Sequence, residues 1–364
     1  MPMEKIAVID ADLIGRKRHR FPNLVCMKLS GYHKDRGDGV TLKTDYHSLD
    51  SFDKVYIAKV FTDTQVPAAV LALPNVEYGG TGFFYDRAEP LPDAIEHHKP
   101  DYHLYDAWVK AQLAAGKKRQ DFHYYADCAI GFLTRGCFRH CAFCVNRNYD
   151  RVRVHSPLSE FVDAGSKRIC LLDDNFLGCP DWKSLLMELR QTGLPFQFRQ
   201  GLDERLLTDE VCGLLFSSRY DGAYIFAFDN YAEAEIVERK IRLLRQYTAA
   251  IPWFYCFTGY DREGKWDAEF WHRDILELIW RIEILMHHRC LPYIMRYHRY
   301  EESPYRGFYI TLARWCNQPA FFKKKSLSEF VDANGMGSAS CRYLSDFERD
   351  FPEAAYFLDL RFGE

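Results

Sequence analysis

Apolar and polar residues alternate along the first part of the chain in a way that predicts alternating strands and helices. Residues 4–10 form an apolar run that ends in acids, and residues 22–37 carry apolar side chains at helical spacing. Three more short apolar runs follow at 39–45, 54–61 and 75–83, and a helical stretch lies at 65–73. We therefore expect a small Rossmann-like α/β domain with a parallel sheet over residues 1–86.

A second series of strand and helix patterns begins after a polar stretch. Residues 87–124 are rich in Pro, His, Asp and Lys, which indicates a linker or wrapping segment. Six apolar runs then predict strands buried on both faces, at 128–134, 167–174, 194–200, 222–229, 251–258 and 291–298. With helical patterns among them, residues 125–300 are expected to form a partial (β/α)6 barrel of the TIM type, whose working face lies at the carboxyl ends of the strands. Residues 301–364 would be a C-terminal extension.

Composition and charge place the chain among folded globular proteins. Of its 364 residues, 48% are hydrophobic and 27% are charged, and the net charge is -3. This balance gives no overall field toward nucleic acid or anionic lipid, so nucleic-acid binding would need a local patch. The first residues carry acids where a signal peptide needs basic and then apolar ones, and no run of 18 apolar residues occurs. We expect a cytoplasmic protein that does not contact membranes.

Three of the twelve cysteines are bunched. Cys137, Cys141 and Cys144 follow the first predicted barrel strand with the spacing C-x3-C-x2-C, whereas the other nine are scattered singly. Three thiolates on about eight residues can converge on one metal centre. An iron–sulfur cube takes one ligand per iron, so three cysteines leave one iron open to another ligand. An open coordination position indicates chemistry rather than a scaffold.

This motif, with the aromatic Phe143 before its last cysteine, resembles that of the radical S-adenosylmethionine (SAM) superfamily. The resemblance covers roughly residues 125–300. It implies a [4Fe-4S] cluster on the three cysteines, with SAM chelating the fourth iron. It also implies an external electron donor of flavodoxin or ferredoxin type, and reductive cleavage of SAM to a 5'-deoxyadenosyl radical that abstracts hydrogen from a substrate the sequence does not identify.

Other functions remain open. Within the superfamily, the chain could transfer a methylthio or methyl group to nucleic acid or peptide, or rearrange a small molecule; methylthio transfer normally needs a second cluster, which the single cysteines do not obviously supply. Outside it, the chain could be a non-enzymatic iron–sulfur or zinc protein. A zinc site could recruit His140 or Cys128, although zinc loops usually add a second pair of ligands that is not visible here.

The ends of the later barrel strands offer candidate SAM contacts. Asp173, Asp174 and Asn175 end the second strand and could accept from the ammonium of SAM, although Asp174 or Asn175 could equally cap a helix. The third strand runs into a pattern similar to the superfamily's R-x-D-x-L turn, with Arg199, Gln200 and Asp203. An arginine there could pair with the methionyl carboxylate, while Asp203 and Arg205 could form a mere surface pair.

Two further charges end apolar strands. Asp229 ends the fourth strand, where related enzymes place a polar residue against SAM, and Arg296 lies on the sixth, where it could contact substrate. A charge in such a position needs a partner, which a bound ligand can provide.

The N-terminal domain resembles a shortened, degenerate cobalamin-binding domain. Such domains commonly hold cobalt through the histidine of D-x-H-x-x-G after the first strand. Residues 10–23, DADLIGRKRHRFPN, lack that spacing, and His19 lies within a basic run. The domain is also about one strand–helix unit short. We therefore expect the cluster and SAM to be the only cofactors, without cobalamin, and the N-terminal domain to act as a lid or substrate platform.

Overall fold

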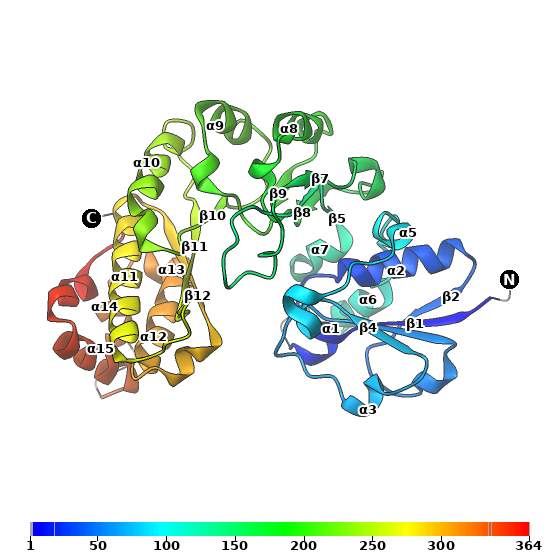
Figure 1. Ribbon diagram of the computed structural model, residues 1–364, viewed down its shortest axis with the longest axis horizontal. Coiled ribbons are helices and arrows are strands. Elements are labelled where there is room, and N and C mark those ends of the chain that lie inside the picture. The colour runs from blue at the N-terminus through cyan, green and yellow to red at the C-terminus, as the bar shows by residue number, and fades with distance from the viewer. Residues whose placement is uncertain (1–2, 18, 334, 336, 364) are drawn as a thin grey trace. The chain divides into compact units, whose positions relative to one another are not determined.

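The computed structural model describes residues 3–17, 19–333, 335 and 337–363 (Figure 1). The chain divides into two compact units, Met1–Gln197 and Phe198–Glu364. Each unit is built on parallel β-sheet with helices, so the α/β class predicted from the sequence is confirmed.

The first unit opens with a four-stranded parallel sheet of order β2-β1-β3-β4. Its strands are β1 (Lys5–Asp10), β2 (Gly39–Leu42), β3 (Lys54–Ala58) and β4 (Val76–Gly79). Short helices α1 (Ala11–Gly15), α3 (Ala68–Leu71) and α4 (Thr81–Phe84) and the longer α2 (Leu24–Asp35) accompany them. Alternate residues of β1 enter two different cores, Ile6 and Val8 on one face and Ala7 and Ile9 on the other. Both faces of the sheet are therefore covered, as its apolar strands require.

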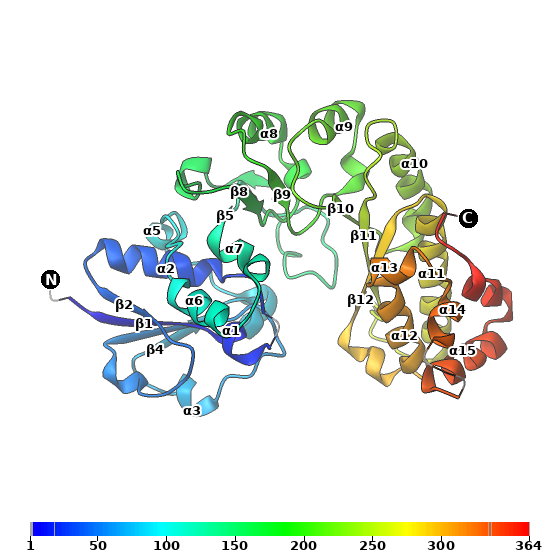
Figure 2. The ribbon, with the colours of Figure 1, turned by 180° about the vertical axis from the view of Figure 1, so that it is seen from behind.

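Residues 87–124 form a packed layer. They contain α5 (Asp93–Glu96) and α6 (Asp106–Ala114) and end within α7 (His123–Ala126). The buried rings of Tyr105, Phe122 and Tyr125 belong to the same core as Ile6 and Val8. Figure 2 shows α6 and α7 near α2 beside this sheet. The segment therefore packs against the first sheet through these rings, and its role as a linker or wrapping segment stays a prediction.

All six predicted barrel strands form, as two three-stranded sheets. One has the order β5-β8-β9, from β5 (Cys128–Gly131), β8 (Arg168–Leu171) and β9 (Phe196–Phe198). The other has the order β10-β11-β12, from β10 (Ile225–Ala227), β11 (Trp253–Thr258) and β12 (Leu291–Arg296). The predicted helices are α8 (Trp182–Gln191), α9 (Asp209–Phe216), α10 (Ala234–Leu244) and α11 (Ala268–His287). Their assembly into one partial barrel stays a prediction.

The second unit is completed by C-terminal helices that pack through aromatic rings. They are α12 (Arg306–Cys316), α13 (Pro319–Phe322), α14 (Leu327–Asp332) and α15 (Ala339–Asp350). The rings of Phe308 and Phe347 stack with centroids 4.4 Å apart, joining α12 to α15. Among the described residues, no helix has both the length and the apolar character needed to cross a membrane.

Candidate functional site

The cysteine loop, residues 136–152, is closed at its neck by two short strands. β6 (Thr134–Arg135) pairs in antiparallel fashion with β7 (Arg153–Val154), shortly after β5. Gly136 begins the loop with φ of +97°, and a Cβ there would lie 2.3 Å from the carbonyl oxygen of Arg151. The neck therefore requires glycine at this position, both for its conformation and for the close approach of the two chain segments.

The three cysteines of this loop are half-buried. The amide of Cys144 donates to the carbonyl oxygen of Cys141 at 2.9 Å, which forms a tight turn. Two sulfur atoms receive N–H groups: Asn146 N lies 3.4 Å from Cys144 Sγ, and Asn175 Nδ2 lies 3.5 Å from Cys137 Sγ. Such donors stabilise thiolates, the form that ligates iron. Three partly accessible sulfurs on one loop are a donor set that fits a [4Fe-4S] cluster.

Two predicted SAM contacts hold the cysteine loop in place. Asp174 accepts from Gly136 N at 2.8 Å and from Asn146 Nδ2 at 2.7 Å, so it joins the two ends of the cysteine motif. Asp173 is buried and accepts from the amide and the hydroxyl of Thr134 at 2.7 and 2.6 Å. Burial raises the pKa of Asp173 to about 7. A role for either carboxylate or for Asn175 toward SAM stays a prediction.

Sequence reasoning missed a second set of contacts to this loop. Asp86 accepts from Arg147 Nε at 2.8 Å and from Arg147 Nη2 at 2.6 Å, and its carbonyl oxygen accepts from Asn148. The hydroxyl of Tyr85 donates to the carbonyl oxygen of Phe143. Asp86 and Arg147 are 61 residues apart, and no spacing rule links them, so only the fold reveals the contact.

In the second unit, the predicted turn after β9 is built around a carboxylate–arginine pair. Arg199 and Gln200 are exposed. Asp203 accepts from the backbone amide of Arg205 and from its Nε at 2.7 Å, and Arg205 also binds Glu233. Asp203 is buried, so the pair that it forms with Arg205 is not the surface pair that was the alternative, and a contact of Asp203 with SAM stays a prediction.

Asp229 and Arg296 also belong to this unit. Asp229 accepts from Phe257 N at 2.8 Å, and burial raises its pKa. The Arg296 guanidinium lies 4.4 Å from the ring centroid of Tyr300, and within the described part of the chain its Nη1 is buried without a hydrogen-bond partner. Glu204, which the sequence did not single out, is 1% exposed, and burial raises its pKa to about 8. Glu204 lies between Leu202 and Leu206, and these apolar neighbours are the sequence signal that could have indicated its burial.

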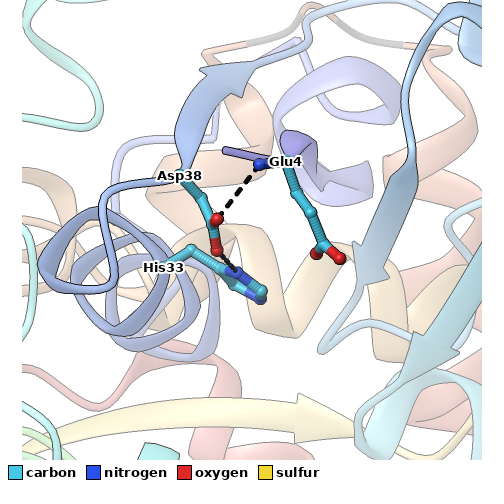
Figure 3. Close-up of side chains that lie close together, drawn as sticks. All are labelled: Glu4, His33 and Asp38. Atoms are coloured by element: carbon cyan, nitrogen blue, oxygen red, sulfur yellow. Dashed lines mark hydrogen bonds and ion pairs between the residues drawn. The ribbon is translucent and has the colours of Figure 1, made fainter. Parts of the chain in front are cut away.

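Glu4, His33 and Asp38 form a separate cluster in the first unit (Figure 3). Their potential ligand atoms lie within 4.8 Å of one another. His33 Nδ1 is 2.7 Å from Asp38 Oδ2, His33 Nε2 is 3.1 Å from the Tyr56 hydroxyl, and Asp38 accepts from the amide of Glu4. These bonds engage both ring nitrogens of His33. The cluster therefore has a structural role, in which it connects the start of β1 to the end of α2.

The carboxyl edge of the four-stranded sheet exposes large apolar side chains. We call Val60, Phe61, Tyr78 and Phe84 the aromatic edge; they are 55%, 41%, 41% and 40% exposed. Tyr78 and Phe84 stack with centroids 5.8 Å apart. The strand order reverses direction between β1 and β3, and parallel sheets of this kind bind ligands at that point.

Comparison with known proteins bears on the fold. No protein-family model matches the sequence, and a search of curated proteins gave no match. Two similar solved structures are of the radical SAM methyltransferase TsrM from Kitasatospora setae. The one with cobalamin and a [4Fe-4S] cluster bound is 12% identical and covers 81% of this chain and 72% of its own, with a TM-score of 0.52. The one with tryptophan substrate and the SAM analogue aza-SAM bound is 13% identical and covers 80% and 72%, with a TM-score of 0.51.

The chain shares the fold of the radical SAM methyltransferase TsrM. The resemblance inferred from the cysteine motif is thereby confirmed at the level of the fold. The prediction that excluded cobalamin is contradicted, because a TsrM structure with this fold has both cobalamin and a [4Fe-4S] cluster bound. That prediction rested on a missing histidine motif and on domain length. A histidine supplies one bond to cobalt, whereas the surface that holds a large macrocycle is apolar and follows no fixed sequence spacing.

Proposed function

We propose that this chain is a radical SAM enzyme with a [4Fe-4S] cluster on Cys137, Cys141 and Cys144. The observation that carries the proposal is the cysteine loop itself, with three half-buried sulfurs, two of which accept N–H groups, and with both ends of the motif fastened by Asp174. When bound, the cluster and SAM supply an electron and a 5'-deoxyadenosyl radical for hydrogen abstraction.

The chain's own residues would hold the cysteine loop, stabilise its thiolates and contact SAM and substrate. Asp174 fixes the loop, and Asn146 and Asn175 stabilise thiolates. For SAM we propose contacts from Phe143, Asp173, Asp174, Asn175, Arg199, Gln200, Asp203 and Asp229, with Arg296 toward substrate. The unpartnered Nη1 of Arg296 supports an anionic group on that substrate. We further propose that residues 125–300 form a partial barrel, which in chain order follows the domain of residues 1–86 with its wrapping layer and precedes the extension of residues 301–364.

We also propose a corrinoid as second cofactor, at the aromatic edge. A large flat macrocycle requires an apolar surface, and the four exposed side chains offer one. Val60 and Phe61 follow β3, one of the two strands between which the strand order reverses, and Tyr78 and Phe84 lie on and after the neighbouring β4. A bound corrinoid would supply a carrier for a methyl group, which favours methyl transfer over the other reactions of the superfamily. The electron donor would be a flavodoxin or ferredoxin in the cytoplasm, where thiols stay reduced.

Anaerobic reconstitution with iron and sulfide tests the proposal. We expect a brown protein with about four irons per chain that releases 5'-deoxyadenosine from SAM under a strong reductant. Cys141→Ala should lose the chromophore, whereas Cys341→Ala, a control at a partly buried cysteine outside the loop, should keep it. A colourless chain with stoichiometric zinc would refute the assignment.

Cobalamin needs its own measurement. The reconstituted protein is incubated with hydroxocobalamin, freed of unbound ligand, and its visible spectrum recorded. Retention of one corrin per chain by the parent, and its loss in Phe61→Ser, would support the aromatic edge as the site. A parent protein that retains no corrin band would refute the second cofactor while leaving the cluster assignment intact.

A further inference from the structure

The segment of residues 79–87 links the four-stranded sheet to the cysteine loop. At its start, Gly80 has φ of +104°, and a Cβ there would lie 2.5 Å from the carbonyl oxygen of Lys59. The amide of Gly82 donates to the same carbonyl oxygen at 3.1 Å. The segment is therefore seated directly on the end of β3, where only glycine permits so close an approach.

The far end of the segment is strained and well anchored. Tyr85 has φ of +51° and ψ of -114°, a conformation that a residue with a side chain rarely adopts. Such strain persists only where the surroundings enforce it. Here the hydroxyl of Tyr85 binds the carbonyl oxygen of Phe143, and Asp86 takes two N–H groups of Arg147.

Arg147 connects Asp86 to the turn that contains Cys141 and Cys144. Its Nη1 donates to the carbonyl oxygen of Ala142 at 2.9 Å, and its own amide donates to that of Cys144 at 3.4 Å. His140, at φ of +49°, places Nδ1 2.8 Å from the Arg147 carbonyl oxygen. Arg147, whose guanidinium is held by Asp86, therefore contacts the backbone on both sides of Phe143, through its guanidinium at Ala142 and through its own amide at Cys144.

We propose that Asp86 is a positioning residue for the cysteine loop, acting through Arg147, so that the four-stranded sheet sets the geometry of the iron ligands. The inference deepens the proposed function and rests on it for its iron-dependent consequence. Asp174 fastens the loop from β8, and Asp86 fastens its outer turn from the other sheet. The cysteine loop is thus contacted by residues that follow a strand in each of two sheets, Asp174 after β8 and Asp86 after β4.

The first test uses the full metal-free chain, so it does not depend on the proposed function. Amide hydrogen exchange is measured in peptides that cover residues 137–148, for Asp86→Asn and for the control Asp163→Asn. Asp163 forms a comparable ion pair with Lys99 at 2.9 Å, outside the loop. Loss of a charge-assisted bond should speed exchange in the loop about tenfold in Asp86→Asn, with no change in the control. Equal exchange in the two variants would overturn the inference.

The second test uses the iron-loaded chain. Electron paramagnetic resonance of the reduced cluster is recorded with and without SAM for the parent, Asp86→Asn, Asp86→Glu and Asp163→Asn. We expect altered g-values in Asp86→Asn, partial recovery in Asp86→Glu and a parental spectrum in Asp163→Asn. Parental spectra in all variants would overturn the inference. A parent that forms no iron centre would instead refute the proposed function, and the exchange result would still decide the role of Asp86.

Discussion

At the carboxyl edges of both sheets in the first unit, a carboxylate that follows one strand holds the loop that follows the neighbouring strand. After β1, buried Asp12 accepts from Val60 N and from the Thr64 hydroxyl, so it holds the loop that follows the neighbouring strand β3. After β8, Asp173 and Asp174 hold the loop that follows the neighbouring strand β5. In both places a carboxylate at one strand end fixes the chain beyond the next strand. The held loop presents Val60 and Phe61 at the first edge and thiols at the second, so the side chains on the loop decide its chemistry.

The sharpest way to break this parallel is to remove each carboxylate in turn. Asp12→Ala leaves two donors without their acceptor and should lower the free energy of unfolding by about 3 kcal/mol while iron content stays parental. Asp174→Ala should cost about 2 kcal/mol and also lower iron content several-fold, since the ends of the cysteine motif come apart. Urea unfolding and an iron assay measure both. An iron content in Asp174→Ala equal to that of the parent would show that Asp174 is not needed to hold the cysteine loop.

A second test addresses Glu96, which contacts elements near both edges. It binds Lys28 of α2 at 3.0 Å and His155, just after β7, at 2.9 Å. Burial acts to raise its pKa, but the His155 hydrogen bond and the Lys28 charge outweigh burial and hold the pKa at about 2. A lowered carboxyl pKa stabilises the fold above its unfolded value of 4.5, and that stability is lost as the pH falls toward 2.

The expected loss over that pH interval is about 3 kcal/mol. It is measured by urea unfolding across the interval, in the parent and in Glu96→Gln. The variant should show a smaller fall than the parent because it has no carboxyl group to titrate at this position. Parallel pH profiles for the two proteins would show that Glu96 does not join the two regions energetically.

Gly136 offers a smaller and more local effect at the second edge. Gly136→Ala should cost about 2 kcal/mol, because the new Cβ meets the Arg151 carbonyl oxygen in addition to an unfavourable φ. The control is Gly116→Ala, because Gly116 has φ of +85° and open space around it, so only the unfavourable φ contributes. It should lower the free energy of unfolding by about 1 kcal/mol. Equal losses in urea unfolding would mean that the neck relaxes without penalty.

The smallest effect is expected at the first edge. Phe61 is 41% exposed, and its ring contacts the Arg16 guanidinium, 4.0 Å from the ring centroid, and the His19 ring, 6.3 Å away between centroids. Phe61→Ser should change the free energy of unfolding by less than about 0.5 kcal/mol. A large destabilisation in thermal or urea unfolding would show that the aromatic edge is part of the core and is not a ligand surface.

Local sequence signals predicted the strands and the cysteine loop well. Apolar runs identified β1, β5 and β12, and the cysteine spacing identified the loop. The helix expected over 65–73 shrinks to Ala68–Leu71, because Pro67 and Pro74 bracket it. The core residues of 87–124 escaped notice, since Tyr105 and Phe122 are dispersed among polar residues. Contacts such as Asp86 with Arg147 depend on chain segments far apart in sequence, and no local period encodes them.

The neck formed by β6 and β7 has a consequence for how iron enters the protein. It closes the cysteine loop with protein hydrogen bonds alone, so the entropy of bringing the loop's ends together is lost when the chain folds and not when metal arrives. Cluster assembly can then be a late event on an already folded chain, in which an iron donor meets a loop of fixed ends. Substitutions inside the loop would in that case affect maturation without disturbing the strands that flank it.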